Sequence, residues 1–217
     1  MRIELHAHTI LSDGELTPSE LVRRAMVAGH EAIAITDHVD MTNIDIVVPA
    51  ILKAAELTDD YITTIPGVEI THVPPKQIDK VIRKAKELGA RWIVVHGETL
   101  AEPVMKGTNM AAAMNPDVDV LAHPGLITDD EMRKAADNDI LIEITGRSFH
   151  NMTNGHVVNV ARRMGASMVV NSDCHAPGDL LNEEDALKVA MGAGMTPKEA
   201  KEAISVIPFN AVKKLDP

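Results

Sequence analysis

The sequence predicts an α/β protein whose parallel strands close into a barrel. Seven short β-rich runs alternate with helical patterns, at the spacing of about 22 to 32 residues that β-α-β units require. Six of the ten histidines lie where a predicted strand ends. In a closed parallel barrel all carboxyl ends of the strands meet at one mouth, whereas an open, doubly wound sheet brings together only those at its switch point. Because six different strand ends carry candidate ligands, the barrel is favoured over the open sheet.

The strands are predicted from short runs of branched and aliphatic residues bounded by turn residues. The third run contains Pro66-Gly67, which we expect to interrupt it. The predicted strands are Arg2–Leu5, Ala32–Thr36, Ile62–Ile70, Arg91–Val95, Val118–Ala122, Ile140–Thr145 and Met168–Asn171.

Helices are predicted from capping signals and from hydrophobic residues at helical spacing. Thr17-Pro18-Ser19-Glu20 forms a capping-box pattern with proline at the first helical position, and Thr196-Pro197-Lys198-Glu199 repeats it. The predicted helices are Ser19–Ala28, Val47–Leu57, Gln77–Leu88, Glu102–Met114, Asp129–Asn138, Gly155–Met164, Asn182–Met191, Thr196–Ser205 and Asn210–Leu215.

Composition and charge limit the classes of function. The chain has 217 residues without a linker or a shift in composition, so we predict a single domain over residues 1–217. Its net charge is −11 and it has only four aromatic residues, so no long nucleic acid is expected as a partner, although a small anionic substrate is compatible with bound metal ions. No membrane span or signal peptide is recognisable, which predicts a cytoplasmic protein. No pattern indicates an oligomeric state.

Histidines and acidic residues at the strand ends predict a metal centre. His6 and His8 are two residues apart, so in an extended chain both side chains point to the same side, and Asp173 and His175 repeat this arrangement. Of the adjacent pair Asp37 and His38, we favour His38 as the ligand and Asp37 as its support. The nine candidate ligands are His6, His8, Asp13, His38, Glu69, His96, His123, Asp173 and His175.

Nine ligands exceed the roughly four to six that one ion takes. They predict two or three divalent ions with at least one bridging carboxylate. Mixed nitrogen and oxygen donors without thiolate suit Zn²⁺, Mn²⁺ or Fe²⁺. The alternative is that these are unrelated polar residues at strand ends.

Seven motifs together resemble the PHP (polymerase and histidinol phosphatase) family of metal-dependent phosphoesterases. In chain order they are HAH, SDG, TDH, PGVE, VVHGE, AHP and SDCH. The resemblance implies a distorted seven-stranded (β/α)₇ barrel, TIM-barrel-like, with a trinuclear site. It implies one ion held by His6, His8, Glu69 and Asp173, a second bridged by Glu69 and held by His96 and His123, and a third held by Asp13, His38 and His175.

The expected reaction is hydrolysis of a small phosphate monoester by a metal-activated hydroxide, with histidinol phosphate as the leading candidate. Catalytic roles are expected for Glu69, Asp173 and His175. Arg147, Lys106 and His150 are the candidates for binding the substrate, since a guanidinium binds phosphate as a fork. The leaving group would take its proton from His175, Asp37 or solvent.

Three other functions are considered. The first is a phosphodiesterase or nucleotidase acting on small nucleotides. The second is a metal-dependent C–N hydrolase, which usually carries a lysine at a strand end, and none is found here. The third is a non-catalytic, metal-stabilised domain, although no expected ligand is missing. A cysteine phosphatase would need an arginine six residues after Cys174, and that position is Leu180, so Cys174 is predicted to be structural.

Overall fold

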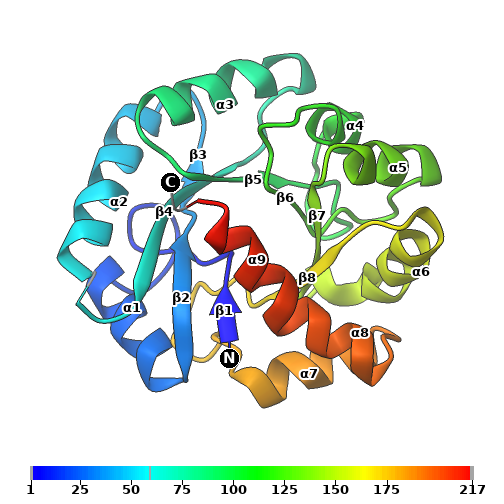
Figure 1. The fold of residues 1–217 in the computed structure, drawn as a ribbon. Helices are drawn as coiled ribbons and strands as arrows, with labels where there is room; N and C mark the ends of the chain where they lie inside the picture. Colours follow the sequence, from blue (N-terminus) through cyan, green and yellow to red (C-terminus); the bar gives the residue numbers. More distant parts are fainter. Residues whose placement is uncertain (1, 59, 216–217) are drawn as a thin grey trace.

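A computed structural model describes residues 2–58 and 60–215, and its strands form one parallel sheet curved into a barrel (Figure 1). A two-residue strand, β3 (His38–Val39), pairs with β4 outside the main order. The strand order is β1 (Arg2–Glu4), β2 (His30–Ile35), β4 (Thr63–Ile70), β5 (Trp92–His96), β6 (Val120–Ala122), β7 (Leu141–Thr145) and β8 (Met168–Asn171).

The barrel is nearly closed between β1 and β8. These strands share no ladder within the described ranges, but an isolated parallel bridge joins Ala7 to Cys174, just beyond both. There the His8 N–H donates to the Cys174 carbonyl at 2.8 Å. The Leu5 N–H donates to the Asn171 side chain at 3.2 Å. The predicted seven-stranded, TIM-barrel-like fold is therefore confirmed, with side-chain bonds replacing part of the last ladder.

Helices surround the barrel, and α9 crosses one of its ends (Figure 1). Short helical turns are η1 (Pro75–Gln77), η2 (His150–Thr153) and a π-helical turn, η3 (Glu202–Val206). The α-helices are α1 (Pro18–Val27), α2 (Ile44–Thr58), α3 (Ile78–Glu87), α4 (Thr108–Ala113), α5 (Asp129–Asp137), α6 (Asn154–Met164), α7 (Glu183–Gly192), α8 (Pro197–Lys201) and α9 (Ile207–Lys213). None of these is long and apolar enough to cross a membrane, nor is any other helix in the described part of the chain.

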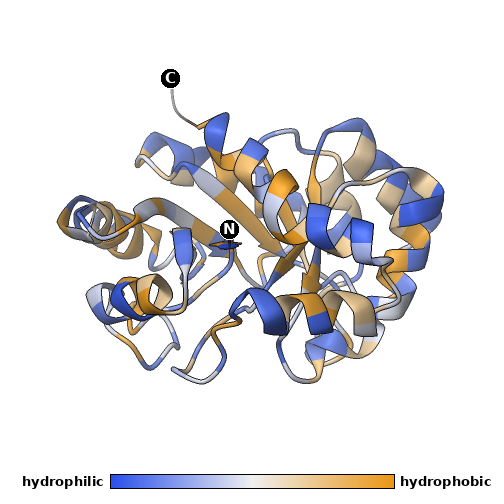
Figure 2. Ribbon diagram, turned by 60° about the horizontal axis from the view of Figure 1, so that its bottom comes forward, coloured by the Kyte–Doolittle hydropathy of each residue, from blue (hydrophilic) through white to orange (hydrophobic). Residues whose placement is uncertain are grey.

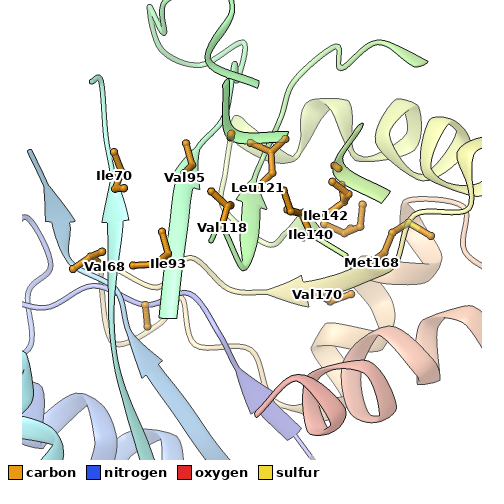
Figure 3. Packing of buried hydrophobic residues seen from close by; sticks show 14 of the residues in the cluster. Val68, Ile70, Ile93, Val95, Val118, Leu121, Ile140, Ile142, Met168 and Val170 are labelled. Carbon is orange, nitrogen blue, oxygen red and sulfur yellow. The ribbon is translucent and has the colours of Figure 1, made fainter. Parts of the chain in front are cut away.

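Alternation along the strands produces two apolar layers. Ile93 and Val95 pack outward against the helices, in the large cluster that Figure 3 shows on neighbouring strands. Trp92 and Val94 belong instead to a second cluster, which Ile207 and Val212 of the C-terminal segment pack against. The hydropathy colouring agrees, because the strands are mostly hydrophobic and the surrounding helices are mixed (Figure 2). The barrel is thus filled with side chains at the end that α9 covers.

Three local predictions were wrong. Pro66-Gly67 does not interrupt β4; the Pro66 carbonyl accepts the Arg91 N–H at 2.8 Å, and a Cβ on Gly67 would meet the Trp92 carbonyl oxygen at 2.8 Å. The helix predicted from Glu102 begins only at Thr108, after Gly107 at φ 96°. Thr17 receives no capping bond from a described residue, although the Thr196 capping box is present.

Candidate metal centre

The strand alternation that fills the barrel also directs polar side chains into its mouth. On β5, Trp92 and Val94 face the inner cluster, and His96, two residues further on, lies on the same face. On β7, Glu143 follows Leu141 in the same way. The inner apolar layer therefore ends in a layer of imidazoles and carboxylates at the carboxyl ends of the strands.

Glu69 and Asp173 lie at the centre of this polar layer, both buried. Glu69 Oε2 lies 3.4 Å from His6 Nε2 and 3.5 Å from His8 Nε2, while Oε1 lies 3.5 Å from His123 Nε2. Asp173 Oδ1 lies 3.3 Å from His8 Nε2, and Oδ2 lies 3.6 Å from His123 Nε2. The two carboxylates thus face shared imidazoles.

A second group lies nearer to solvent. Asp13, whose side chain is 56% exposed, places Oδ1 3.4 Å from His38 Nε2 and 3.3 Å from His175 Nε2. His8 completes this group, because one ligand atom from each of the four residues lies within 4.8 Å of the others. The structure therefore brings together the candidate ligands His8, Asp13, His38 and His175, and two of them, His8 and His38, also contact Glu69.

Several buried polar atoms of the centre have no hydrogen-bond partner among the described residues. They are His6 Nε2, both ring nitrogens of His8, both carboxylate oxygens of Glu69 and His123 Nδ1. Glu69 Oε2 does lie 2.8 Å from His38 Nδ1, as an ion-pair contact without hydrogen-bond geometry. Leaving such atoms unpaired in the interior costs about 1–3 kcal/mol each. Imidazole nitrogens and carboxylate oxygens are ligands that zinc, manganese and iron accept. Divalent ions would satisfy the Glu69 oxygens and one nitrogen of each imidazole ring, so the residues fit a metal centre.

The centre is strongly polarised. Burial alone would lower the pKa of His6, but the carboxylates of Glu143 and Glu69 raise it well above its usual value. Burial and the neighbouring His38 lower the pKa of His8 to about 3. Burial alone would lower the pKa of His38 as well, yet Glu69 and Asp13 raise it to about 10. Without metal the carboxylates hold protons on some imidazoles, which bound ions would displace.

Further polar groups orient the candidate ligands. His6 Nδ1 lies 2.7 Å from Glu143 Oε1, and His38 Nδ1 lies 2.6 Å from Thr71 Oγ1. Asp37 is buried and accepts the Thr9 N–H at 2.8 Å, so it holds the loop that follows His8. Glu143 was not among the predicted site residues, although an acidic residue inside the apolar run LIEIT is a recognisable signal. Glu102 and His72 were not predicted as site residues either, because no local sequence pattern gave a signal for them.

The candidate substrate residues differ in their position. Arg147 and His150 line a cavity of about 450 Å³, together with Glu102 and the exposed apolar side chains of Leu100, Phe149 and Met152. Arg147 Nη1 lies 3.4 Å from Asp179 Oδ2, which also accepts the His175 N–H at 3.0 Å. Lys106 is exposed, does not line this cavity, and makes no hydrogen bond or ion pair with any residue that the structure describes.

Comparison with known proteins places the chain in a family. The family model described as "PHP domain" matches residues 4–154. An uncharacterized protein of Methanocaldococcus jannaschii is 49% identical over 218 residues, which are 99% of this chain and 100% of that one. Ribonuclease P protein component 3 of Methanosarcina barkeri is 26% identical over 94% of this chain and 86% of its own.

A solved structure supports the fold. Histidinol phosphate phosphatase of Lactococcus lactis, complexed with zinc, L-histidinol and phosphate, superposes with a TM-score of 0.65 at 15% identity, over 90% of this chain and 94% of that one. The PHP-domain model covers more than half of the sequence, and its range contains the whole of strands β2 to β7. The chain therefore belongs to the PHP-domain family of phosphoesterases.

Proposed function

We propose that this protein hydrolyses a small phosphate monoester at a divalent-metal centre, with histidinol phosphate as the first candidate. The observation that carries the proposal is the group of buried, unpaired imidazole and carboxylate atoms at the barrel mouth, with Arg147 beside it. The relative from Lactococcus lactis, which has the same fold, is a histidinol phosphate phosphatase.

The nine candidate ligands divide among three ions. His6, His8 and Asp173 would hold one ion with Glu69, which would also bridge to an ion on His96 and His123. Asp13, His38 and His175 would hold the third. When bound, such ions lower the pKa of water and neutralise charge on a phosphate. Zn²⁺, Mn²⁺ and Fe²⁺ all suit these donors.

The remaining residues would bind and orient the phosphate. Arg147 offers a charged fork for the phosphate oxygens. Asp179 links this guanidinium to the backbone of His175 and so sets its position relative to the centre. His175 Nδ1 lies 3.0 Å from the Asp173 carbonyl, which leaves Nε2 for an ion. We therefore assign His175 a ligand role, and solvent in the open cavity supplies the proton for the leaving group. The role of Lys106 in substrate binding remains a prediction from the sequence.

A small nucleotide is the second candidate substrate. The Phe149 side chain is 72% exposed on the wall of the Arg147 cavity, where a flat apolar ring can stack on a base. One relative is a ribonuclease P protein component, so RNA is a further candidate partner. The net charge of −11 disfavours a long nucleic acid, because phosphate binding depends on a basic surface.

The test is phosphate release from histidinol phosphate, measured beside mononucleotides and sugar phosphates. The protein is loaded with Mn²⁺, Fe²⁺ or Zn²⁺, and His6→Ala is the control. We expect turnover with a preference for histidinol phosphate that the substitution abolishes. Preference for a nucleotide would contradict histidinol phosphate as the substrate, but it would support metal-dependent phosphate ester hydrolysis. No turnover with any metal would contradict the proposal and favour a non-catalytic, metal-stabilised domain.

A further inference from the structure

Three side chains outside the nine candidate ligands surround His96. Glu102 Oε2 lies 3.3 Å from His96 Nε2 and 2.9 Å from His72 Nε2. The other oxygen, Oε1, lies 3.5 Å from His150 Nε2. One carboxylate on the loop after β5 thus faces three imidazoles that come from three different loops or strands.

His150 points inward rather than to the surface. It is 8% exposed, and its Nδ1 has no hydrogen-bond partner among the described residues. Its ring centroid lies 4.5 Å from that of His123. Ligand atoms of His96, His123 and His150 lie within 4.8 Å of one another. A buried, unpaired imidazole nitrogen beside two candidate ligands is the arrangement that a bound ion would satisfy.

The backbone holds both extra residues in place. Phe149 has φ 69°, a conformation that residues other than glycine rarely adopt, and its exposed side chain directly precedes the buried His150. On the opposite loop, Glu98 Oε1 accepts the N–H groups of Gly107 at 2.8 Å and Asn109 at 3.0 Å. These bonds close the loop that carries Glu102, so neither residue is a freely moving surface group.

We propose that Glu102 and His150 are further ligands of the ion held by Glu69, His96 and His123, and that His72 orients Glu102. Two imidazoles and one shared carboxylate leave coordination positions open, and two more donors would bring this ion to five protein ligands, a number that suits Mn²⁺ or Fe²⁺ better than four-coordinate Zn²⁺. Glu102 is 38% exposed and lines the cavity that contains Arg147, so it would be the protein ligand beside the substrate. The inference rests on the centre binding metal, and it does not depend on the substrate.

The test measures metal binding directly. Metal-free protein is titrated with Zn²⁺ or Mn²⁺ by calorimetry, and the ions retained after dialysis are counted by elemental analysis. Glu102→Gln and His150→Ala are each expected to raise the Kd of one ion by about 10-fold or more, and to leave the other ions bound. Since His150 is buried, its replacement could impair folding. Glu102→Gln changes a partly exposed residue and keeps the proposal testable.

Two substitutions outside the centre serve as controls. His156→Ala removes a histidine of α6 whose Nε2 lies 2.8 Å from the Ile127 carbonyl, and Glu87→Gln removes an acid of α3. Both controls are expected to bind metal like the unmodified protein. Kd values within twofold of that protein for both test variants would overturn the proposal. Loss of all ions in Glu102→Gln would also overturn the proposal, because the substitution should weaken the binding of only one ion. Either result would leave the proposed phosphatase activity to be judged by its own assay.

Discussion

His6 and Glu143 form a buried contact between the segment that follows β1 and strand β7. His6 Nδ1 lies 2.7 Å from Glu143 Oε1, and both side chains have no exposed surface. The same carboxylate accepts the Asn171 side-chain amide at 2.9 Å and the His123 N–H at 3.1 Å. Glu143 thereby fixes the ring of His6 so that Nε2 faces Glu69. It is a positioning residue, which acts on the centre through His6 and His123.

Glu143→Gln is expected to lower metal affinity by about 10- to 100-fold. The glutamine amide oxygen is a weaker hydrogen-bond acceptor for the His6 ring than the carboxylate, and the substitution also removes a negative charge. The measurement is competition with a chelator of known affinity. Thermal unfolding of the metal-free variant, compared with the parent protein, separates a folding defect from a binding defect. An unchanged affinity in a normally folded variant would show that His6 does not need this partner.

Gly125 is expected to tolerate no side chain. It has φ 61°, and a Cβ there would lie 1.9 Å from the Glu98 carbonyl oxygen. Gly125→Ala should destabilise the fold by at least about 2 kcal/mol, which corresponds to a fall in Tm of about 4–8 °C in a chain of this size. Gly178→Ala is the matched control, since no described atom lies within 4 Å of the position that its Cβ would take. Equal Tm values for the two variants would contradict the prediction.

Asp119 should make stability depend on pH. Burial raises the pKa of Asp119 to about 6 in the folded protein, above its ordinary value of 3.8. The folded state therefore binds the proton more tightly, and this stabilisation is lost as the pH rises through about 6. Asp119→Asn, which keeps an acceptor for the Ile93 N–H, should be neutral near pH 4 and stabilising at pH 8.

The gain at pH 8 is expected to be on the order of 2 kcal/mol, less than the full shift implies, because the side chain is only partly buried and solvent screens it. It is measured as the difference in free energy of unfolding between variant and parent at each pH. A difference that is constant from pH 4 to pH 8 would show that Asp119 does not titrate in this range.

Cys174 is expected to be inert in the folded protein. Its side chain is fully buried, and burial together with nearby carboxylates raises the pKa of its thiol to about 12. The thiolate is the reactive form, so a thiol reagent at pH 8 should modify the protein only after denaturation, at one equivalent per chain. Rapid modification of the native protein would mean that the segment around Asp173 and His175 opens readily.

The sequence by itself determined the barrel and the group of candidate ligands. Both follow from local rules: strands and helices have different hydrophobic periods, and parallel strands deliver their carboxyl ends to one mouth. His6, His96 and His123 could be placed there from their positions at strand ends alone. The same rules made Pro66-Gly67 look like a break, because they do not register that Gly67 packs against Trp92.

Only the tertiary structure decided how the mouth is completed. Glu102 belongs to a loop where a helix was predicted, and it meets His72 and His150 across 30 and 48 residues of sequence. Such contacts depend on where each loop returns over the barrel, and no local period or capping signal encodes that path. The closure at Asn171 and the position of Glu143 beneath His6 have the same origin, since side chains from separate strands meet only once the sheet has curved.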